Sequence, residues 1–340
     1  MNLKELADSL NLSQTTVSRA LNGYPEVREE TRDRVLKAAQ AANYQPNSRA
    51  RRLATGRSMA VGHVIPLSDQ HQMVNPIFAD FLAGAGEVCA RVGYDLVLSV
   101  VAETEVEAAY RKMASNGSVD GLMVHGPRTE DPRIALLQSL GLPFIVHGRS
   151  AAPESYSWLD IENRTAFRQA TDLLLDLGHR RIGLLNGFTD FDFAHRRQRG
   201  YEQALDARGV AFDEALVRTD EMTESFGYRA AKELLARENP VTAMMTSSVL
   251  IAVGARRAVA ERGWQLGREV SLVTHDDVLS YLPNAGDGPA FTATRSPVRA
   301  AGSRAAEMLM ELIDSPNTGP RQELWPVEIT LGRTTGPCLT

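Results

Sequence analysis

The feature that most restricts the fold of this chain is a series of short apolar runs that alternate with helical stretches from residue 60 onward. The runs end in Gly, Pro or polar residues and read VGHVIP, YDLVLSVV, GLMVHG, PFIVHG, RIGLLNG, AMMTSS and SLVTHDD. Intervening stretches such as AFRQATDLLLDLGH and LIAVGARRAVAERG carry apolar residues at helical spacing. Repeated strand–helix units predict buried parallel strands covered by helices. Seven or more such units exceed what one sheet conveniently holds, so we expect two doubly wound lobes.

The charge of the 340 residues is distributed unevenly. Residues 1–58 hold ten Lys/Arg and six Asp/Glu, a net charge of +4, whereas the whole chain carries −5, which leaves −9 on the remainder. A basic head on an acidic body predicts an anionic partner for the head alone. Charge by itself leaves a solvated helical surface as an equal alternative.

The sequence also indicates a compartment. No apolar run reaches the ~20 residues that cross a bilayer, and the opening MNLKELADSL has no apolar signal core. Cys89 and Cys338 lie far apart and make no metal-ligand spacing. We therefore expect a cytoplasmic protein in a reducing compartment, with no membrane partner and no metal or other cofactor.

The first 44 residues show three helical patterns. Asn2 followed by Glu5 predicts a capping box at the start of the first helix. Ser13 is expected to cap the second helix, in which Val17 and Ala20 can face inward. The third helix lies in VREETRDRVLKAA. Two short helices joined by a tight turn and braced by a third predict a helix-turn-helix.

The second helix, SQTTVSRALNG at residues 13–23, is polar on the side opposite its apolar stripe. Gln14, Thr15, Ser18 and Arg19 share that polar side. A helix this thin can lie in a DNA major groove and offer amide, hydroxyl and guanidinium groups to base edges. The alternative is a small helical cap without a ligand.

Residues 44–58, YQPNSRARRLATGRS, form a basic segment between this region and the body. Pro46 ends the preceding helix, and Asn47 can cap a short segment that is too basic to be stable alone. Against DNA the segment could fold, with arginines on phosphates and Leu53 wedged into the minor groove. The alternative is a flexible linker.

Residues 3–58 resemble the headpiece of the LacI/GalR family of bacterial transcription regulators. The resemblance lies in LADSLNLSQTTVSRALNG, then VREETRDRVLKAA, then YQPNSRARRLATGRS. It implies that the second helix reads bases and that Leu53 is a lever in the hinge. One departure is Arg28, where the family usually has Ser, which puts the cap of the third helix in doubt. The residues expected to contact DNA are Ser13, Gln14, Thr15, Thr16, Ser18, Arg19, Asn22, Tyr44, Asn47, Arg51 and Leu53.

Polar residues follow the apolar runs of the body, where ligands bind in such folds, beyond the carboxyl ends of the strands and between lobes. Carboxylates and guanidinium groups hydrogen-bond to paired hydroxyls, and aromatic rings pack on apolar C–H faces. The polar and aromatic residues at these positions therefore suit a polyhydroxylated ligand. Each residue alone is more often structural, and the prediction depends on the set. The candidates are Asn75, Phe78, His125, His147, Arg149, Asp160, Glu162, Phe191, Arg197, Thr246, Ser247, His275 and Asp276.

The family resemblance continues through the body and covers nearly the whole chain. NPIFADFLAGAGEVCARVGYDLVL looks like the first strand-helix-strand, with Asn75 and Phe78 at the mouth of the cleft. Arg197 falls where the family carries an effector-binding arginine. SLVTHDDV resembles the motif whose first aspartate, here Asp276, binds effector, with His275 in place of the usual tyrosine. All the candidates above except His125 and Thr246 are therefore expected to bind the effector.

Three departures from the family pattern affect these expectations. Glu162-Asn163 replaces an Asp-Asn pair, with Asp160 two residues earlier; both carboxylates would point the same way on a strand, so the choice between them stays open. Ser248-Val249 replaces an Asn-Asp pair, so the effector need not match that of a better-known relative. The chain stops at GRTTGPCLT without a leucine heptad tail, so we expect a dimer rather than a tetramer.

Two other classes of protein were weighed against this interpretation. The sequence has no G-x-S-x-G, P-loop, G-x-G-x-x-G or H-E-x-x-H motif, and adjacent residues of HDD at 275–277 alternate faces on a strand, so we do not expect an enzyme. A transport-type sugar-binding protein shares the two-lobed body but would need a signal peptide and would not carry the headpiece.

The sequence therefore predicts a sugar-responsive transcriptional repressor. Two headpieces of a homodimer would grip a pseudo-palindromic operator, and effector binding would change the angle between the lobes and separate the hinge segments. The opening MNLKELADSLNLSQTTVSRALNGYPEV is similar to regulators of α-glucoside uptake, so the expected effector is a mono- or disaccharide of this type. A purine is the less favoured alternative. The protein would act in the cytoplasm, at the nucleoid.

Domain boundaries follow from the same patterns. We expect an all-α helix-turn-helix headpiece over residues 1–46 and a hinge segment over 47–58. A two-lobed, periplasmic-binding-protein-like α/β core would occupy 59–340, with the first lobe at 59–158 and 291–319 and the second at 159–290 and 320–340.

Overall fold

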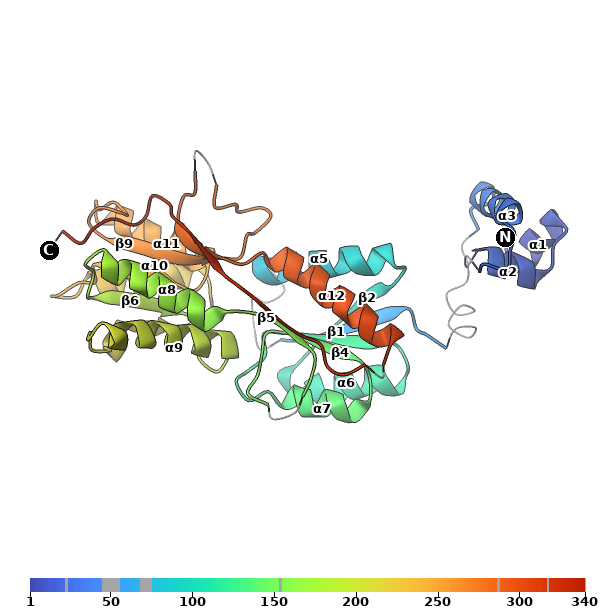
Figure 1. The fold of residues 1–340 in the computed structure, drawn as a ribbon, viewed down its shortest axis with the longest axis horizontal. Coiled ribbons are helices and arrows are strands. Elements are labelled where there is room, and N and C mark those ends of the chain that lie inside the picture. The colour runs from blue at the N-terminus through green and yellow to red at the C-terminus, as the bar shows by residue number, and fades with distance from the viewer. Residues whose placement is uncertain are drawn as a thin grey trace. The chain divides into compact units, whose positions relative to one another are not determined.

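Among the residues that the structure describes, three short helices belong to the N-terminal unit, and two α/β lobes follow (Figure 1). The computed structural model describes residues 1–21, 24–44, 56–67, 75–152, 155–285, 288–316 and 318–339. It divides into a headpiece, Met1–Met59, and a core, Ala60–Thr340. None of the helices within these ranges has both the length and the apolar composition that a membrane crossing requires.

The headpiece consists of α1 (Leu3–Leu10), α2 (Gln14–Leu21) and α3 (Glu29–Ala41). The predicted capping box is confirmed, because Asn2 and Glu5 each accept the other's backbone N–H across 2.9 Å. Ser13 caps α2 by accepting from the Thr16 N–H at 3.1 Å. Arg28 precedes α3 without a side-chain cap, in agreement with the departure noted in the sequence. The small core between the three helices is built from Leu6, Ala7, Val17, Ala20, Val27, Val35 and Ala39.

The first lobe contains a six-stranded sheet in the order β11-β5-β4-β3-β1-β2. All its strand pairs are parallel. Helices α5 and α12 cover one face, and α6 and α7 cover the other (Figure 1). The strands are β1 (Ala60–Pro66), β2 (Asp95–Val101), β3 (Gly121–His125), β4 (Phe144–His147), β5 (Trp158–Ile161) and β11 (Gln322–Trp325). The helices are α5 (Pro76–Arg91), η2 (Glu103–Glu105), α6 (Val106–Ser115), α7 (Pro132–Leu140) and α12 (Val298–Asp314).

The second lobe repeats this plan with the sheet order β12-β10-β9-β8-β6-β7. Its strands are parallel except for β12, which pairs antiparallel with β10 at the edge. The prediction of two doubly wound lobes is thus confirmed. The strands are β6 (Ile182–Asn186), β7 (Val217–Thr219), β8 (Ala243–Thr246), β9 (Ser271–Asp276), β10 (Thr292–Arg295) and β12 (Glu328–Thr330). The helices are α8 (Asn163–Asp176), α9 (Asp192–Ala207), η3 (Glu214–Leu216), α10 (Glu224–Leu235) and α11 (Val249–Glu261).

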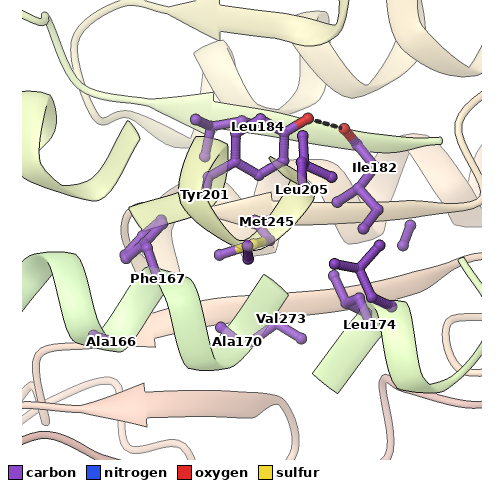
Figure 2. Close-up of a cluster of buried hydrophobic side chains, with 13 residues drawn as sticks. Ala166, Phe167, Ala170, Leu174, Ile182, Leu184, Tyr201, Leu205, Met245 and Val273 are labelled. Atoms are coloured by element: carbon purple, nitrogen blue, oxygen red, sulfur yellow. Dashed lines mark hydrogen bonds between the residues drawn. The ribbon is translucent and has the colours of Figure 1, made fainter. Parts of the chain in front are cut away.

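The core of the second lobe lies between its sheet and the pair α8 and α9 (Figure 2). Leu174 and Phe167 of α8 meet Leu184 of β6 and Met245 of β8 there. The buried Tyr201 on α9 satisfies its hydroxyl by donating to the Ile182 carbonyl at 2.8 Å. The apolar runs at 181–187 and 243–248 are therefore buried strands, as their sequence predicts.

Helix pairs approach each other closely through glycines. A Cβ added at Gly84 of α5 would lie 2.0 Å from the Arg299 carbonyl oxygen of α12, and one added at Gly302 of α12 would lie 2.0 Å from the Phe81 carbonyl oxygen. Gly254 makes the same close approach between α11 and α10. These positions have no room for a side chain, so the glycines fix the spacing of the helices that cover each sheet.

Two expectations about the core require correction. The run YDLVLSVV forms β2, but β2 is an edge strand whose Val97, Leu98 and Val100 are exposed rather than buried. The lobe boundaries also shift, because β5 and β11 pair in the first sheet and β10 pairs in the second. Each of these three strands has four residues. Strands so short do not reveal their sheet in the sequence, because tertiary hydrogen bonding decides which neighbour they join.

DNA-facing helix and ligand cleft

Helix α2 presents the polar face that the sequence predicts. Val17 and Ala20 are buried against α1 and α3, while Gln14, Thr15 and Arg19 are exposed. Of the other residues expected to contact DNA, Ser13 is exposed and Thr16, Ser18 and Tyr44 are half-buried. Asn22, Asn47, Arg51 and Leu53 lie outside the described residues, as does the hinge segment apart from residues 56–58. The roles in DNA contact stay predictions.

A cleft between the two lobes holds two adjoining cavities. The larger has a volume of about 500 Å³ and the smaller of about 90 Å³, and they share His125, Gly126, Phe193 and Met222 as lining. We call them the large cavity and the small cavity. Of the candidates from the sequence, the large cavity is lined by Asn75, Phe78, His125 and Phe191. The small cavity is lined by His125, His147, Asp160, Arg197, Ser247 and His275. Arg149, Glu162, Thr246 and Asp276 line neither.

Arg197 lies buried in the wall of the small cavity. Its Nε donates to Asn163 Oδ1 at 2.7 Å, and its Nη1 donates to the Ser247 carbonyl at 2.6 Å. The rings of Phe167 and Phe193 lie 5.2 and 4.9 Å from its guanidinium carbon. Burial lowers the pKa of Arg197 to about 10, so the side chain is still charged at neutral pH.

Asp160 and Glu162 differ in their position relative to the end of β5. Asp160 lies within the strand, is buried and lines the small cavity. Glu162 follows the strand at the N-cap position of α8 and lines neither cavity. Asp160 accepts a hydrogen bond from Arg149 Nε at 2.6 Å. Arg149 lines neither cavity, so it is connected to the site through the Asp160 carboxylate.

At the end of β9 the structure places Asp277 on the cavity wall, where sequence reasoning named Asp276. Asp276 lies outside both cavities and accepts from the Val278 N–H at 2.8 Å. Asp277 is buried, its Oδ2 has no hydrogen-bond partner among the described residues, and its Oδ1 lies 3.7 Å from His275 Nε2. Burial raises the pKa of Asp277 to about 7. Side chains alternate along a strand, so residues 275 and 277 lie on the same face. The prediction of His275 as a cleft residue could therefore have indicated Asp277 rather than Asp276.

A row of three histidines, of which His63 is buried and His125 and His147 are half-buried, crosses the first sheet and lines the two cavities. His63 on β1 lies against the ring of Phe78, with centroids 5.2 Å apart. His125 and His147, opposite each other on β3 and β4, meet Nδ1 to Nδ1 at 3.0 Å. Burial lowers the pKa of all three, to about 4 for His63 and His147, so they are neutral at physiological pH. No set of three or more His, Cys, Asp or Glu in the described ranges is arranged to hold a metal.

The lobes also touch beside the cavities. Arg128, which follows β3, reaches Asp190 of the second lobe with its Nη1 at 3.1 Å. Backbone bonds run in both directions, from the Thr129 N–H to the Asp190 carbonyl at 2.9 Å and from the Asp192 N–H to the Pro127 carbonyl at 3.1 Å. Sequence reasoning missed these loop residues, along with His63, Asn163, Phe193 and Met222 in the cavity walls. Only Asn163, beside the altered Glu162, carried a signal in the sequence.

Comparison with known proteins agrees with this architecture. Residues 2–47 match the family described as bacterial regulatory proteins, lacI family, and residues 171–335 match a periplasmic binding protein-like domain. The HTH-type transcriptional regulator AglR of Rhizobium meliloti (strain 1021) is 44% identical over 99% of this chain and 95% of that protein. RafR of Escherichia coli is 33% identical over 96% of each. A complex of the transcriptional regulator CelR with cellobiose is 27% identical, with a TM-score of 0.72 over 98% of this chain and 99% of that one.

These relatives share the full length of the chain and both of its parts, the helix-turn-helix headpiece and the two-lobed core. They are transcription regulators, so the prediction that the chain is not an enzyme is confirmed. The chain belongs to the LacI family of bacterial transcription regulators, as a DNA-binding repressor controlled by an effector.

Proposed function

We propose that the chain represses transcription at a pseudo-palindromic operator and that a mono- or disaccharide bound in the cleft controls its affinity for that operator. The observation that carries this proposal is the lining of the two cavities. Carboxylate and guanidinium groups line the small cavity, at Asp160, Asp277 and Arg197, and phenylalanine rings line mainly the large cavity. Sugars require this combination, because their hydroxyls need charged or polar partners while their C–H faces pack on rings.

The size of the cleft supports a ligand larger than one sugar ring. The large cavity measures about 500 Å³, within the range of pockets for small organic ligands. The small cavity beside it concentrates the buried polar groups. A disaccharide could therefore place one ring against Arg197 and Asp277 and the other against Phe78 and Phe191. The solved complex of CelR contains cellobiose, a disaccharide, in a relative that spans the same length.

We further propose that the effector is an α-glucoside. The similarity of the opening sequence to regulators of α-glucoside uptake supports this choice. A purine is a second candidate, because four phenylalanines, Phe78, Phe188, Phe191 and Phe193, line the large cavity and could stack on a base. A repressor named PurR of Escherichia coli is 28% identical over 94% of this chain, so the experiment below also includes a purine.

The DNA-binding half of the proposal depends on α2. Its exposed Gln14, Thr15 and Arg19 present an amide, a hydroxyl and a guanidinium on one face, the groups that read base edges in the major groove. Residues 47–58, with Leu53, would enter the minor groove as the hinge. The protein would act in the cytoplasm, at the nucleoid, where its operator lies.

We propose a homodimer, because one headpiece contacts only one half of a pseudo-palindrome. The exposed apolar side chains of β2 support a partner at this edge. Val97, Leu98 and Val100 are 38 to 42% exposed on a strand that forms one edge of the sheet within the described residues. Edge strands of this kind are usually covered or charged in monomers.

Coupling between the two functions would follow from the position of the cleft. A ligand that touches Asp160 of the first lobe and Arg197 of the second contributes binding energy only when the two lobes hold a particular angle. Such a ligand shifts the population of lobe arrangements toward the one it binds best. The two arrangements would differ in how the first lobes present their headpieces.

The proposal can be tested with the full chain in two steps. Duplexes would first be selected in vitro from random DNA by the protein itself, and the recovered site would then be titrated in the presence of glucose, trehalose, maltose, sucrose or hypoxanthine. A thermal-shift measurement with the same compounds reports binding, since a ligand at 100 times its Kd adds about 2.7 kcal/mol. We expect a disaccharide to change operator affinity. Failure of every sugar, or a response to hypoxanthine alone, would contradict a sugar effector.

A further inference from the structure

Charged side chains are concentrated in the walls of the cleft, and the acidic ones outnumber the basic ones. The arginines are Arg111, Arg128 and Arg133 in the large cavity and Arg197 in the small cavity. The carboxylates are Glu103, Glu107, Asp131, Asp220 and Glu221 in the large cavity, and Asp160 and Asp277 in the small cavity. Among the described lining residues carboxylates therefore outnumber arginines even if Asp277 is protonated, and Asp160 and Asp220 are themselves paired with Arg149 and Arg229 just outside the lining.

Each arginine of the large cavity is already occupied by a carboxylate. Arg133 is the most firmly held, because both its Nε and its Nη2 donate to the buried Asp131. The ion pairs measure 2.7 Å for Arg111–Glu107 and 2.6 Å for Arg133–Asp131, and Arg128 pairs with Asp190 at 3.1 Å and with Glu103 at 3.3 Å. A phosphate or carboxylate entering the cavity would therefore meet each of these cations beside a carboxylate and would have to share it or displace that partner.

Arg197 is the one lining guanidinium in the described residues whose hydrogen bonds go to neutral groups, the Asn163 amide oxygen and the Ser247 carbonyl. Its charge is nonetheless offset, because Asp160 and Asp277 lie close enough to raise its pKa against the effect of burial. Phenylalanine rings lie near its guanidinium. Hydroxyl groups can still bridge from the guanidinium to the neighbouring carboxylates, whereas an anion would be brought against those carboxylates.

We propose that the cleft selects an uncharged saccharide and rejects the phosphorylated form of the same sugar. This inference rests on the proposed function and narrows its ligand class. The physical cause is that an anion loses its hydration in the cleft and meets there only cations that already lie beside carboxylates. A neutral sugar donates hydroxyl protons to the same carboxylates without this cost.

The experiment compares matched pairs of probes with the full chain. Glucose and glucose 6-phosphate, trehalose and trehalose 6-phosphate, and sucrose and sucrose 6-phosphate are titrated by calorimetry at low ionic strength. We expect the neutral member of at least one disaccharide pair to bind, and its phosphorylated partner to bind at least about 100-fold more weakly, the size of effect that like-charge juxtaposition produces. Equal or tighter binding of a phosphorylated sugar would overturn the inference while leaving a sugar effector in place.

A pair of variants tests the cause. Glu107→Gln frees Arg111 from its ion pair, and it should raise the affinity for the phosphorylated probe about threefold to tenfold. Glu233→Gln is the matched control, because Glu233 also pairs with an arginine, Arg218 at 3.0 Å, and is exposed to the same degree, 62% against 64% for Glu107. Equal effects of the two substitutions would contradict a role for the cavity charges. If no probe of any pair binds and none alters operator affinity, both this inference and the proposed function fail.

Discussion

Arg197 donates its Nε–H to the side-chain oxygen of Asn163 across 2.7 Å, so a buried cation is held by a neutral amide. The Asn163 amide in turn donates to Asp160 at 3.2 Å. Asp160 belongs to the last parallel strand before the chain crosses to the second lobe, and Asn163 begins the first helix after it. This relay therefore joins the two lobes through the wall of the small cavity.

Asn163→Ala should destabilise the free protein by about 1–3 kcal/mol, because it leaves a buried guanidinium N–H without an acceptor. Urea unfolding followed by circular dichroism measures the change. Asn116→Ala is a control at the exposed end of α6 and should stay within about 0.5 kcal/mol. A loss at Asn163 no larger than at Asn116 would show that the relay does not stabilise the fold.

The buried Asp277 predicts a dependence of stability on pH. Its pKa is raised to about 7 in the folded protein by burial and by Asp276, against the opposing effect of Arg197, while the neighbouring His275 is neutral. The folded state therefore binds more protons than the unfolded state between the ordinary carboxyl pKa and about 7. The contribution of Asp277 is fully present below pH 4 and is lost as pH rises toward 7, by an amount on the order of a few kcal/mol.

The measurement is the free energy of unfolding of the unaltered chain and of Asp277→Asn between pH 5 and pH 8. The variant should gain stability relative to the unaltered chain as pH rises, because its amide carries no charge to bury. Identical pH profiles for the two proteins would show that Asp277 ionises normally. The same pair should differ in ligand affinity, since an amide cannot replace a carboxylate as a double acceptor of hydroxyls.

The close packing of α5 on α12 predicts opposite effects for two glycines of one helix. Gly84→Ala should cost several kcal/mol, because the new Cβ would lie 2.0 Å from a backbone oxygen of α12. Gly86→Ala meets nothing within 4 Å and should stabilise the helix by about 0.5–1 kcal/mol. Thermal unfolding of both variants separates the steric cost from helix propensity. Similar behaviour at the two positions would mean that the helices can move apart.

The exposed face of α2 predicts a loss of DNA recognition that leaves the fold intact. Arg19→Ala should weaken binding to the selected operator by about 1–3 kcal/mol and reduce discrimination against random duplex. Lys37→Ala, which removes the same charge from an exposed position on α3, should lower both affinities alike. Competition binding at two salt concentrations distinguishes these outcomes, and equal behaviour of the two variants would remove the reading role of Arg19.

The apolar edge at β2 predicts an interface between two copies of the chain. Val100→Glu should shift the protein from dimer to monomer in sedimentation at micromolar concentration, because a charge would be buried against the partner. Leu324→Glu alters β11, at the opposite edge of the same sheet, where the side chain is 41% exposed against 42% for Val100. We expect it to leave the dimer unchanged. A dimer that survives Val100→Glu would place the interface elsewhere.

The sequence by itself determined the parts of the molecule that depend on local pattern. The Asn2–Glu5 capping box, the polar side of α2 and the alternation of buried strands with helices follow from spacing along the chain, and the structure shows each of them. Arg197 and Asp160 were placed in the cleft because strand ends and helix starts meet there in any doubly wound fold.

Tertiary structure alone decided which neighbours these elements found. The sequence of a four-residue strand such as β10 or β11 does not indicate which sheet it joins. Its lobe follows only from the backbone hydrogen bonds that it makes with a neighbouring strand. Asp277 rather than Asp276 faces the cavity because the pleat at the end of β9 turns it inward. The pairing of Arg128 with Glu103 and Asp190 also lay beyond the sequence, since these partners come together only when loops of the two lobes pack in three dimensions, whereas Arg111–Glu107 and Arg133–Asp131 are local pairs.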